Sequence, residues 1–161
     1  IQIKKMISID VVSECNLWNK KIKKPHIFFS TLVKVFPKKY RFIKKKISLT
    51  ILLSNNKNIK ILNKKFRNKN KATDVLSFSA EKKINIKKSP YIGDIIVSYE
   101  FMNKPKTLNT LEFKSKMTKI FIHGFLHLLG YDHIKSKDFK EMLIEEEKIY
   151  KTIEKKIAQL D

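Results

Sequence analysis

The chain has 161 residues, 42% of them hydrophobic, and a formal net charge of +21. This length and composition suit a single domain over residues 1–161 with one core, and exclude two separate domains of ordinary size. The longest apolar run, residues 120–129, is shorter than the roughly 20 residues needed to cross a bilayer, so we expect no membrane partner. The single Cys15 suits the reducing cytoplasm, because one thiol cannot form an internal disulfide.

The positive charge is confined to the first four-fifths of the chain. Residues 1–130 hold 29 lysines and arginines against 7 acidic residues, whereas residues 131–161 hold 7 against 8. A field of this size attracts polyanions, and nucleic acid is the leading candidate. The alternative is a solvated, lysine-rich surface without such a partner. Charge alone leaves both interpretations open.

Hydrophobic periodicity predicts both strands and helices along the chain. A strand is expected over residues 1–9 and a helix over residues 25–36, where Pro25 suits a first helical turn. The remaining predicted elements are a strand over 47–53, a helix over 56–66, strands over 74–79 and 94–98, a helix from 109 to about 130, and a helix over 136–160. The pattern therefore predicts an α+β fold with about four strands.

Apolar residues at helical spacing indicate which face of each predicted helix is buried. The residues expected to face the core are Ile27, Phe28, Leu32, Val35 and Phe36; Ile59, Leu62 and Phe66; Leu111, Met117, Ile120 and Phe121; and Phe139, Met142, Leu143, Ile149, Ile153 and Ile157. The helix that starts at Asn109 has Glu112 three residues later, which is the spacing of a capping box. We interpret the last helix as structural.

Three of the four histidines lie within eleven residues, and this cluster is the strongest functional signal in the sequence. His123 and His127 are four residues apart, so on a helix both rings can direct a nitrogen to one point. Gly130 can adopt the left-handed conformation that ends a helix, which lets His133 approach the same point. Three protein ligands leave a fourth position free on zinc, as in catalytic sites, so we predict one zinc ion per chain. The alternative is a set of core histidines satisfied by hydrogen bonds.

Gly124 argues against peptide hydrolysis. The spacing His-x3-His-x2-Gly-x2-His is also that of metzincin proteases, in which a glutamate after the first histidine is the general base. Gly124 cannot accept a proton, so we expect a hydrolase that relies on the metal and on other groups. A glycine within a helix also costs about 1 kcal/mol relative to alanine. This cost predicts a close approach by backbone or substrate at Gly124.

Residues 123–133, His-Gly-Phe-Leu-His-Leu-Leu-Gly-Tyr-Asp-His, resemble the signature of the YbeY family of bacterial endoribonucleases that mature ribosomal RNA. Two further segments resemble the same family. They are Asn63-x3-Arg67 leading to residues 73–78, Thr-Asp-Val-Leu-Ser-Phe, and residues 92–95, Ile-Gly-Asp-Ile. The histidine signature is highly specific, and the other two segments are moderately so.

The resemblance extends from about residue 49 to the last helix, where Met142 and Glu146 also match. The departures are Asn68, Asn70, Ala72 and Ser79, where the family more often has Gly, Asp, Pro and Pro. These departures loosen a loop and leave the predicted metal ligands unchanged.

The resemblance implies an α+β domain with a mixed four-stranded sheet and about five helices. It implies a zinc ion on His123, His127 and His133 at the end of a central helix, and a need for Arg67 as well as His123 in catalysis. The implied function is a single-strand-specific, zinc-dependent endoribonuclease that acts in rRNA processing, at the 3′ end of 16S rRNA, and in ribosome quality control. The implied partners are single-stranded RNA, rRNA and ribosomal particles.

Arg67 also has a physical argument of its own. A guanidinium group can bind a phosphate through two donors in a fixed plane, which lysine cannot. The chain has only two arginines among its 36 basic residues, and one of them precedes the Thr73-Asp74 segment. The alternative is an ordinary solvated arginine.

Other polar residues are assigned supporting roles. Asp74, Asp94 and Asp132 are candidates to orient the histidine rings through their second nitrogens, or else to cap turns and helices. The lysine-rich segments 20–24, 38–46 and 64–71 are expected to bind the RNA backbone with little base specificity.

Two rival functions share part of this evidence. A zinc metalloprotease would use the same ligands, but the missing glutamate and the positive charge count against it. A non-catalytic ribosome-assembly factor with a structural metal would also bind RNA. Composition does not separate this second rival from a nuclease.

Overall fold

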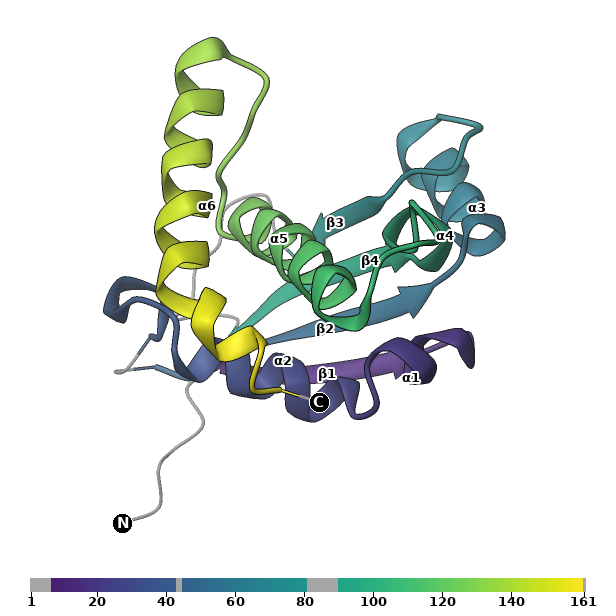
Figure 1. Ribbon diagram of the computed structural model, residues 1–161. Helices are drawn as coiled ribbons and strands as arrows, with labels where there is room; N and C mark the ends of the chain where they lie inside the picture. The colour runs from purple at the N-terminus through teal and green to yellow at the C-terminus, as the bar shows by residue number, and fades with distance from the viewer. Residues whose placement is uncertain (1–6, 43–44, 81–89, 161) are drawn as a thin grey trace.

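A mixed four-stranded sheet lies at the centre of the computed structural model, which describes residues 7–42, 45–80 and 90–160 (Figure 1). The strands lie in the order β1 (Ile7–Ser13), β2 (Ile47–Ser54), β4 (Tyr91–Ser98) and β3 (Val75–Ser79). β1, β2 and β4 are parallel, and β3 runs antiparallel to β4. The predicted α+β class and mixed four-stranded sheet are therefore confirmed. Of the strand predicted over residues 1–9, residues 7–9 lie in β1 and residues 1–6 lie outside the described residues.

The four predicted helices are present, together with two short ones. The helices of the described residues are α1 (Leu17–Lys21), α2 (Pro25–Lys34), α3 (Asn56–Arg67), α4 (Tyr99–Met102), α5 (Thr110–Leu128), α6 (Ser136–Ile157) and the 3₁₀ turn η1 (Lys38–Tyr40). α1 and α4 have five and four residues, which is too short for a helical period to appear in the sequence. No helix in the described part of the chain is long and apolar enough to cross a membrane.

Local hydrogen bonds explain where α3 and α5 begin. The side chain of Asn55 accepts the N–H of Asn58 at 2.9 Å. The Glu112 N–H donates to Asn109 Oδ1 at 2.8 Å, and the Asn109 N–H donates to Glu112 Oε1 at 3.0 Å. This reciprocal pair confirms the predicted capping box. It satisfies two N–H groups that would otherwise lack partners at the start of α5.

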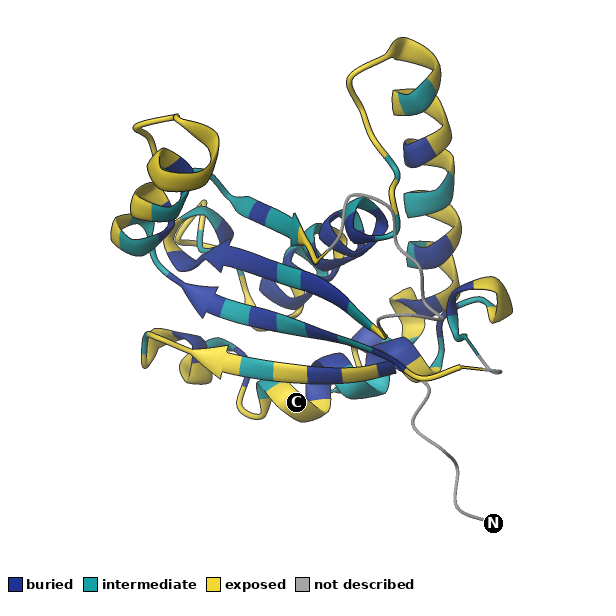
Figure 2. Cartoon of the chain, turned by 180° about the vertical axis from the view of Figure 1, so that it is seen from behind, coloured by how far each residue is buried: buried dark blue, intermediate teal, exposed yellow. Residues whose placement is uncertain are grey.

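Helices α5 and α2 lie on one face of the sheet, and α6 packs against α5 (Figures 1 and 2). Ile95 and Val97 of β4 belong to the main core on this face. Ile96, between them, forms a second small cluster with Ile59 of α3 and Leu76 of β3. Because side chains alternate along a strand, α3 covers part of the opposite face. The sheet thus separates two cores, and α5 runs through the larger one.

Five predicted core residues are exposed instead. They are Ile27, Phe66, Leu111, Phe139 and Leu143. All five lie in the first two turns or the last turn of their helices, where a helix can extend past the elements that cover its middle. The remaining predicted core residues are buried or partly buried. Helical spacing therefore identified the correct face but not the length over which each face is covered.

Gly93 permits the close packing of β3, β4 and α5. It lies where the pairing of β2 with β4 shifts register, and its φ of +141° is one that residues with side chains rarely adopt. A Cβ atom at this position would overlap the backbone carbonyl of Phe78 and lie 2.8 Å from Leu128 Cδ2. Backbone atoms cannot yield as a flexible side chain can, so only glycine fits here.

We predict that Gly93→Ala lowers the free energy of unfolding by about 3 kcal/mol, because backbone strain and overpacking each contribute about 1–2 kcal/mol. Urea unfolding with a chelator present measures this loss. Gly130→Ala is the matched control: its φ is +99°, but a Cβ atom there would meet nothing within 4 Å. The control should lose only the strain contribution, and equal losses in both variants would rule out the packing explanation.

Candidate metal centre

A glycine turn at the end of α5 connects the first two predicted ligands to the third. Gly130 has a φ of +99°. Its N–H donates to the carbonyl of His127 at 3.0 Å, and the Tyr131 N–H donates to the carbonyl of Leu126 at 3.0 Å. These two bonds form a Schellman motif, which ends the helix and redirects the chain. The segment that follows brings His133 back beside the end of α5.

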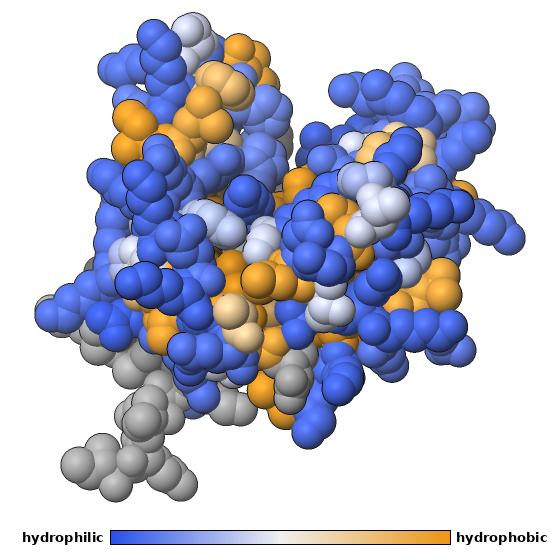
Figure 3. Space-filling model, in the orientation of Figure 1, coloured by the Kyte–Doolittle hydropathy of each residue, from blue (hydrophilic) through white to orange (hydrophobic). Residues whose placement is uncertain are grey.

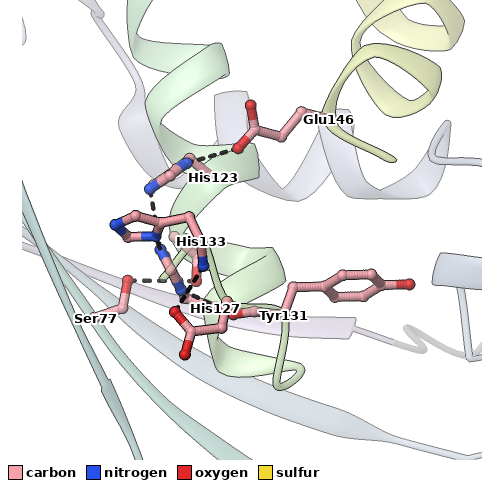
Figure 4. A network of polar contacts seen from close by, with 8 residues as sticks. Ser77, His123, His127, Tyr131, His133 and Glu146 are labelled. Atoms are coloured by element: carbon pink, nitrogen blue, oxygen red, sulfur yellow. Dashed lines mark hydrogen bonds and ion pairs between the residues drawn. The ribbon is translucent and has the colours of Figure 1, made fainter. Parts of the chain in front are cut away.

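The three predicted histidines converge on one point (Figure 4). Nε2 of His127 lies 3.1 Å from Nε2 of His123 and 3.1 Å from Nδ1 of His133. One nitrogen from each ring lies within 4.8 Å of the others. Nitrogens bound to tetrahedral zinc at about 2.05 Å would be about 3.3 Å apart. The two separations that involve His127 are close to this value, and the donor set is that of a single metal site.

The outer nitrogens of two rings are fixed by hydrogen bonds. His123 Nδ1 lies 2.6 Å from Glu146 Oε1, and His127 Nδ1 lies 2.9 Å from the carbonyl oxygen of Tyr131. Both partners accept a hydrogen bond from Nδ1–H, so the Nε2 atom of each ring is left directed toward the shared point. Three inward nitrogens held this close together are the donor arrangement of a metal site.

Burial helps to keep His127 in the form that binds metal. It lowers the pKa of His127 below its usual value of 6.5, and the charge of neighbouring His123 lowers this pKa further. The ring therefore stays neutral at neutral pH. Neutral imidazole is the form that donates a lone pair to a metal.

Among the described residues, none of the three candidate aspartates forms a hydrogen bond with a histidine ring. Asp74 and Asp132 each accept the N–H of the next residue, at 2.8 Å and 2.6 Å, and Asp94 accepts the hydroxyl of Tyr91. The prediction that these carboxylates hold the ring nitrogens is wrong, and the alternative role in turns fits Asp74 and Asp132. The carboxylate that does hold a ring is Glu146, whose only sequence signal was its match to the family pattern.

A second network, absent from the sequence predictions, holds the loop of His133. The hydroxyl groups of Tyr131 and Tyr40 lie 3.2 Å apart, and Tyr40 donates to Glu145 of α6. This hydrogen bond is the main cause that lowers the pKa of Glu145, and burial is the main cause that raises the pKa of Tyr40. Tyr131 supplies both a phenol to this network and a carbonyl to His127. These hydrogen bonds thereby connect the loop that carries His133 to η1 and to α6.

The histidines open into a cavity of about 720 Å³ whose rim is basic. Arg67, Lys69 and Lys71 line it. Nη2 of Arg67 donates to the carbonyl of Ser77 at 3.0 Å, and the guanidinium lies 5.6 Å from the ring centroid of Phe78. The structure thus places the predicted residue Arg67 at the same cavity as the three histidines. The described residues of segments 20–24 and 38–46 do not line this cavity, whereas the end of segment 64–71 does.

Gly124 allows α5 to lie close to the sheet. A Cβ atom there would lie 3.0 Å from Ile95 Cγ2 and 3.1 Å from Ser77 Oγ. A close approach is present at Gly124, but it is made by side chains of β4 and β3 and not by the predicted backbone or substrate. This close packing of α5 on the sheet places His123 and His127 near the edge strand β3, which carries Ser77.

Comparisons with known proteins agree with this geometry. The family model described as endoribonuclease YbeY matches residues 14–154. The chain is 71% identical over 153 residues to endoribonuclease YbeY of Pelagibacter ubique, which covers 95% of this chain and 100% of that relative. It is 33% identical over 155 residues to endoribonuclease YbeY of Prochlorococcus marinus, covering 89% of this chain and 75% of that relative.

The fold also matches a solved structure. The solution structure of a protein from Thermotoga maritima matches with a TM-score of 0.57 and 25% identity, over 94% of this chain and 93% of that one. The stretches of this chain that match the family model and the P. ubique relative both span residues 123–133 and Arg67. The chain therefore belongs to the endoribonuclease YbeY family.

Proposed function

We propose that this protein is a zinc-dependent endoribonuclease that cleaves single-stranded RNA. The observation that carries the proposal is the convergence of His123, His127 and His133 in a cavity with a basic rim. Membership of an endoribonuclease family supports RNA as the substrate. The net charge of +21 supports a polyanionic partner, because such a field speeds the capture of nucleic acid.

The residues of the cavity can divide the work of phosphodiester cleavage among them. Zinc, when bound, supplies a Lewis acid that polarises a phosphate oxygen or a water molecule. Arg67 presents the guanidinium donors that Ser77 does not use, and these can pair with phosphate oxygens as negative charge builds up on them. Lys69 and Lys71 attract the neighbouring phosphates. Glu146 keeps the His123 ring in its ligand orientation.

Zinc is proposed on the chemistry of the donors. The three nearest groups are imidazole nitrogens, which suit zinc and other transition metals and do not suit magnesium or calcium. The donor nitrogen of His127 lies 3.1 Å from each of the other two, close to the separation in a tetrahedral zinc site, and three protein ligands leave one position free. A fourth position open to the cavity is where a substrate oxygen can bind.

Within the cell we propose ribosomal RNA in ribosomal particles as the substrate, with the 3′ end of 16S rRNA as the processed site and ribosome quality control as a second role. The resemblance of residues 123–133 to the signature of rRNA-maturing endoribonucleases supports this assignment. Such a reaction belongs to the cytoplasm, where ribosomal particles are made.

Two alternatives are tested by the same assays. A ribosome-assembly factor with a structural metal would bind RNA but leave it intact. A metalloprotease lacks support here, because Gly124 stands where a general base would be needed and its neighbours Ile95 and Ser77 supply no carboxylate.

Removal of the metal should abolish RNA cleavage, and added zinc should restore it, because the histidines alone supply no Lewis acid. Elemental analysis should find one zinc ion per chain and a large loss in His127→Ala. His26→Ala is the matched control, since His26 is exposed and lies outside the cluster. Wild-type protein that holds zinc and binds single-stranded RNA without cutting it would favour the assembly factor.

Arg67→Ala should lower kcat/KM for single-stranded RNA about 100-fold, the usual effect of losing one donor to a developing oxyanion. Arg67→Lys should recover only part of this loss, because an ammonium group cannot form the bidentate contact. Lys65→Ala removes a charge from the same helix away from the cavity lining and should stay within a few fold of wild type. Equal rates for the Arg67 and Lys65 variants would show that only overall charge matters.

Glu146→Gln should weaken zinc binding about 10-fold or more, because a metal-bound histidine loses affinity when its outer acceptor is weakened. Competition with a chromogenic chelator measures the zinc affinity. Glu147→Gln makes the same charge change one residue away, where the carboxylate pairs only with exposed Lys151. Unchanged zinc affinity in the Glu146 variant would mean that this carboxylate does not position the ring.

A further inference from the structure

The first half of α6 carries apolar side chains that nothing in the described part of the chain covers. α6 extends well beyond the end of α5 (Figure 1). Ile134, before the helix, is 83% exposed, and Phe139 and Leu143 are 47% and 45% exposed. We call these three residues the apolar wall. Figure 3 shows hydrophobic residues on this upper part of the molecule and a hollow between α6 and α3.

The apolar wall begins at the metal cavity and continues along α6, where Phe139 and Leu143 lie outside the cavity lining. Ile134 itself lines the cavity. Phe139, Leu143 and Glu146 are spaced four and three residues apart on α6, so their side chains share one face of the helix. Glu146 of that face contacts the ring of His123. Phe139 therefore lies on the metal side of α6, about 10 Å along the helix axis from Glu146.

The two sides of the cavity differ in chemistry. The side of α3 and the following loop supplies Arg67, Lys69 and Lys71 to the lining. Ile134 also lines the cavity, and Phe139 and Leu143 continue this apolar surface along α6, beyond the lining. A single strand of RNA has the same division, with phosphates along one edge and the flat faces of unpaired bases along the other. In a duplex the bases are stacked inside and cannot reach an apolar surface beside the helix.

We propose that the apolar wall binds unpaired bases of the RNA while the basic side binds its phosphates, with the ring of Phe139 as the stacking surface. This inference rests on the proposed function, since it concerns the substrate of the same site. Stacking on an aromatic ring tolerates any base, because every base has a π face. The wall thus selects for single strands without selecting a sequence.

Ile144 allows a surface that binds RNA bases to be distinguished from a surface that binds protein. Ile144 is 52% exposed, about as much as Phe139, and lies on the same helix. It is two residues from Glu146, so it points away from the face that contacts His123. A protein partner that docked on the apolar end of α6 would have both residues within reach, whereas an RNA strand that leaves the cavity along the face of α6 that carries Glu146 would bring its bases to Phe139 only.

The test is the binding of a short, fluorescein-labelled single-stranded RNA by fluorescence anisotropy, with a chelator present so that no cleavage occurs. Phe139→Ala should bind about tenfold more weakly, Phe139→Trp should bind as tightly as wild type or more tightly, and Ile144→Ala should bind as wild type does. Thermal melting of each variant checks that the fold is intact.

The salt dependence separates the two sides of the cavity. Lys69→Ala removes a phosphate contact, so it should reduce the slope of log affinity against log salt by about one. Phe139→Ala should weaken binding by the same factor at every salt concentration and leave the slope unchanged, because stacking releases no counterions.

Equal affinities for Phe139→Ala and Ile144→Ala would overturn the inference, whether both bind as wild type does or both bind more weakly. An equal loss in both would point to a broader interaction surface for protein. The proposed function can fail separately. If wild-type protein loaded with zinc binds RNA through Phe139 and never cuts it, the role of the apolar wall in binding is supported and the nuclease assignment is wrong.

Discussion

The arrangement of the site depends on two imidazole rings that direct one nitrogen each to the same point. Nε2 of His123 and Nε2 of His127 lie 3.1 Å apart, close to the separation of two nitrogens on one zinc ion. The hydrogen bonds of the opposite nitrogens to Glu146 and to the Tyr131 carbonyl hold the rings in place. The protein thus holds these two ligand atoms in position by itself, and the free energy of metal binding does not have to reorient them.

Several parts of the fold serve this arrangement. The glycine at position 124 lets α5 approach β3 and β4, which brings the histidines over the end of the sheet. The turn at Gly130 directs the chain toward His133. α6 contributes two neighbouring carboxylates with separate tasks: Glu145 holds the loop through Tyr40, and Glu146 holds the first histidine ring. A helix interpreted from its sequence as structural therefore also supports the site.

The cavity combines two kinds of surface that suit a flexible polyanion. Its basic side comes from the end of α3 and the loop after it, where Arg67 is fixed by Ser77. Ile134 lines the same cavity, and the part of α6 that extends past its packing partners continues this apolar surface beyond the lining. A surface with only positive charge would bind duplex and single strand alike. An apolar surface beside the charge adds a preference for unpaired bases, because only unpaired bases can stack on it.

The sequence by itself determined the class of the fold, most helices and strands, the capping box at Asn109, and the identity of the three converging histidines. These features are set by local patterns, namely hydrophobic period, turn residues and residue spacing on one helix, which act over a few positions. The short helices α1 and α4 escaped this reasoning because they contain too few residues to show a period.

Only the tertiary structure decided which groups hold the histidines. Glu146 lies 23 residues from His123 in the chain, and Tyr40 lies 91 residues from Tyr131, so no local pattern links them. Asp74, Asp94 and Asp132 were plausible by residue type and belong to or adjoin the segments that match the family pattern, yet their hydrogen bonds go to other groups. The exposure of Phe139 was likewise hidden, because helical spacing shows which face is apolar and packing decides how much of that face is covered.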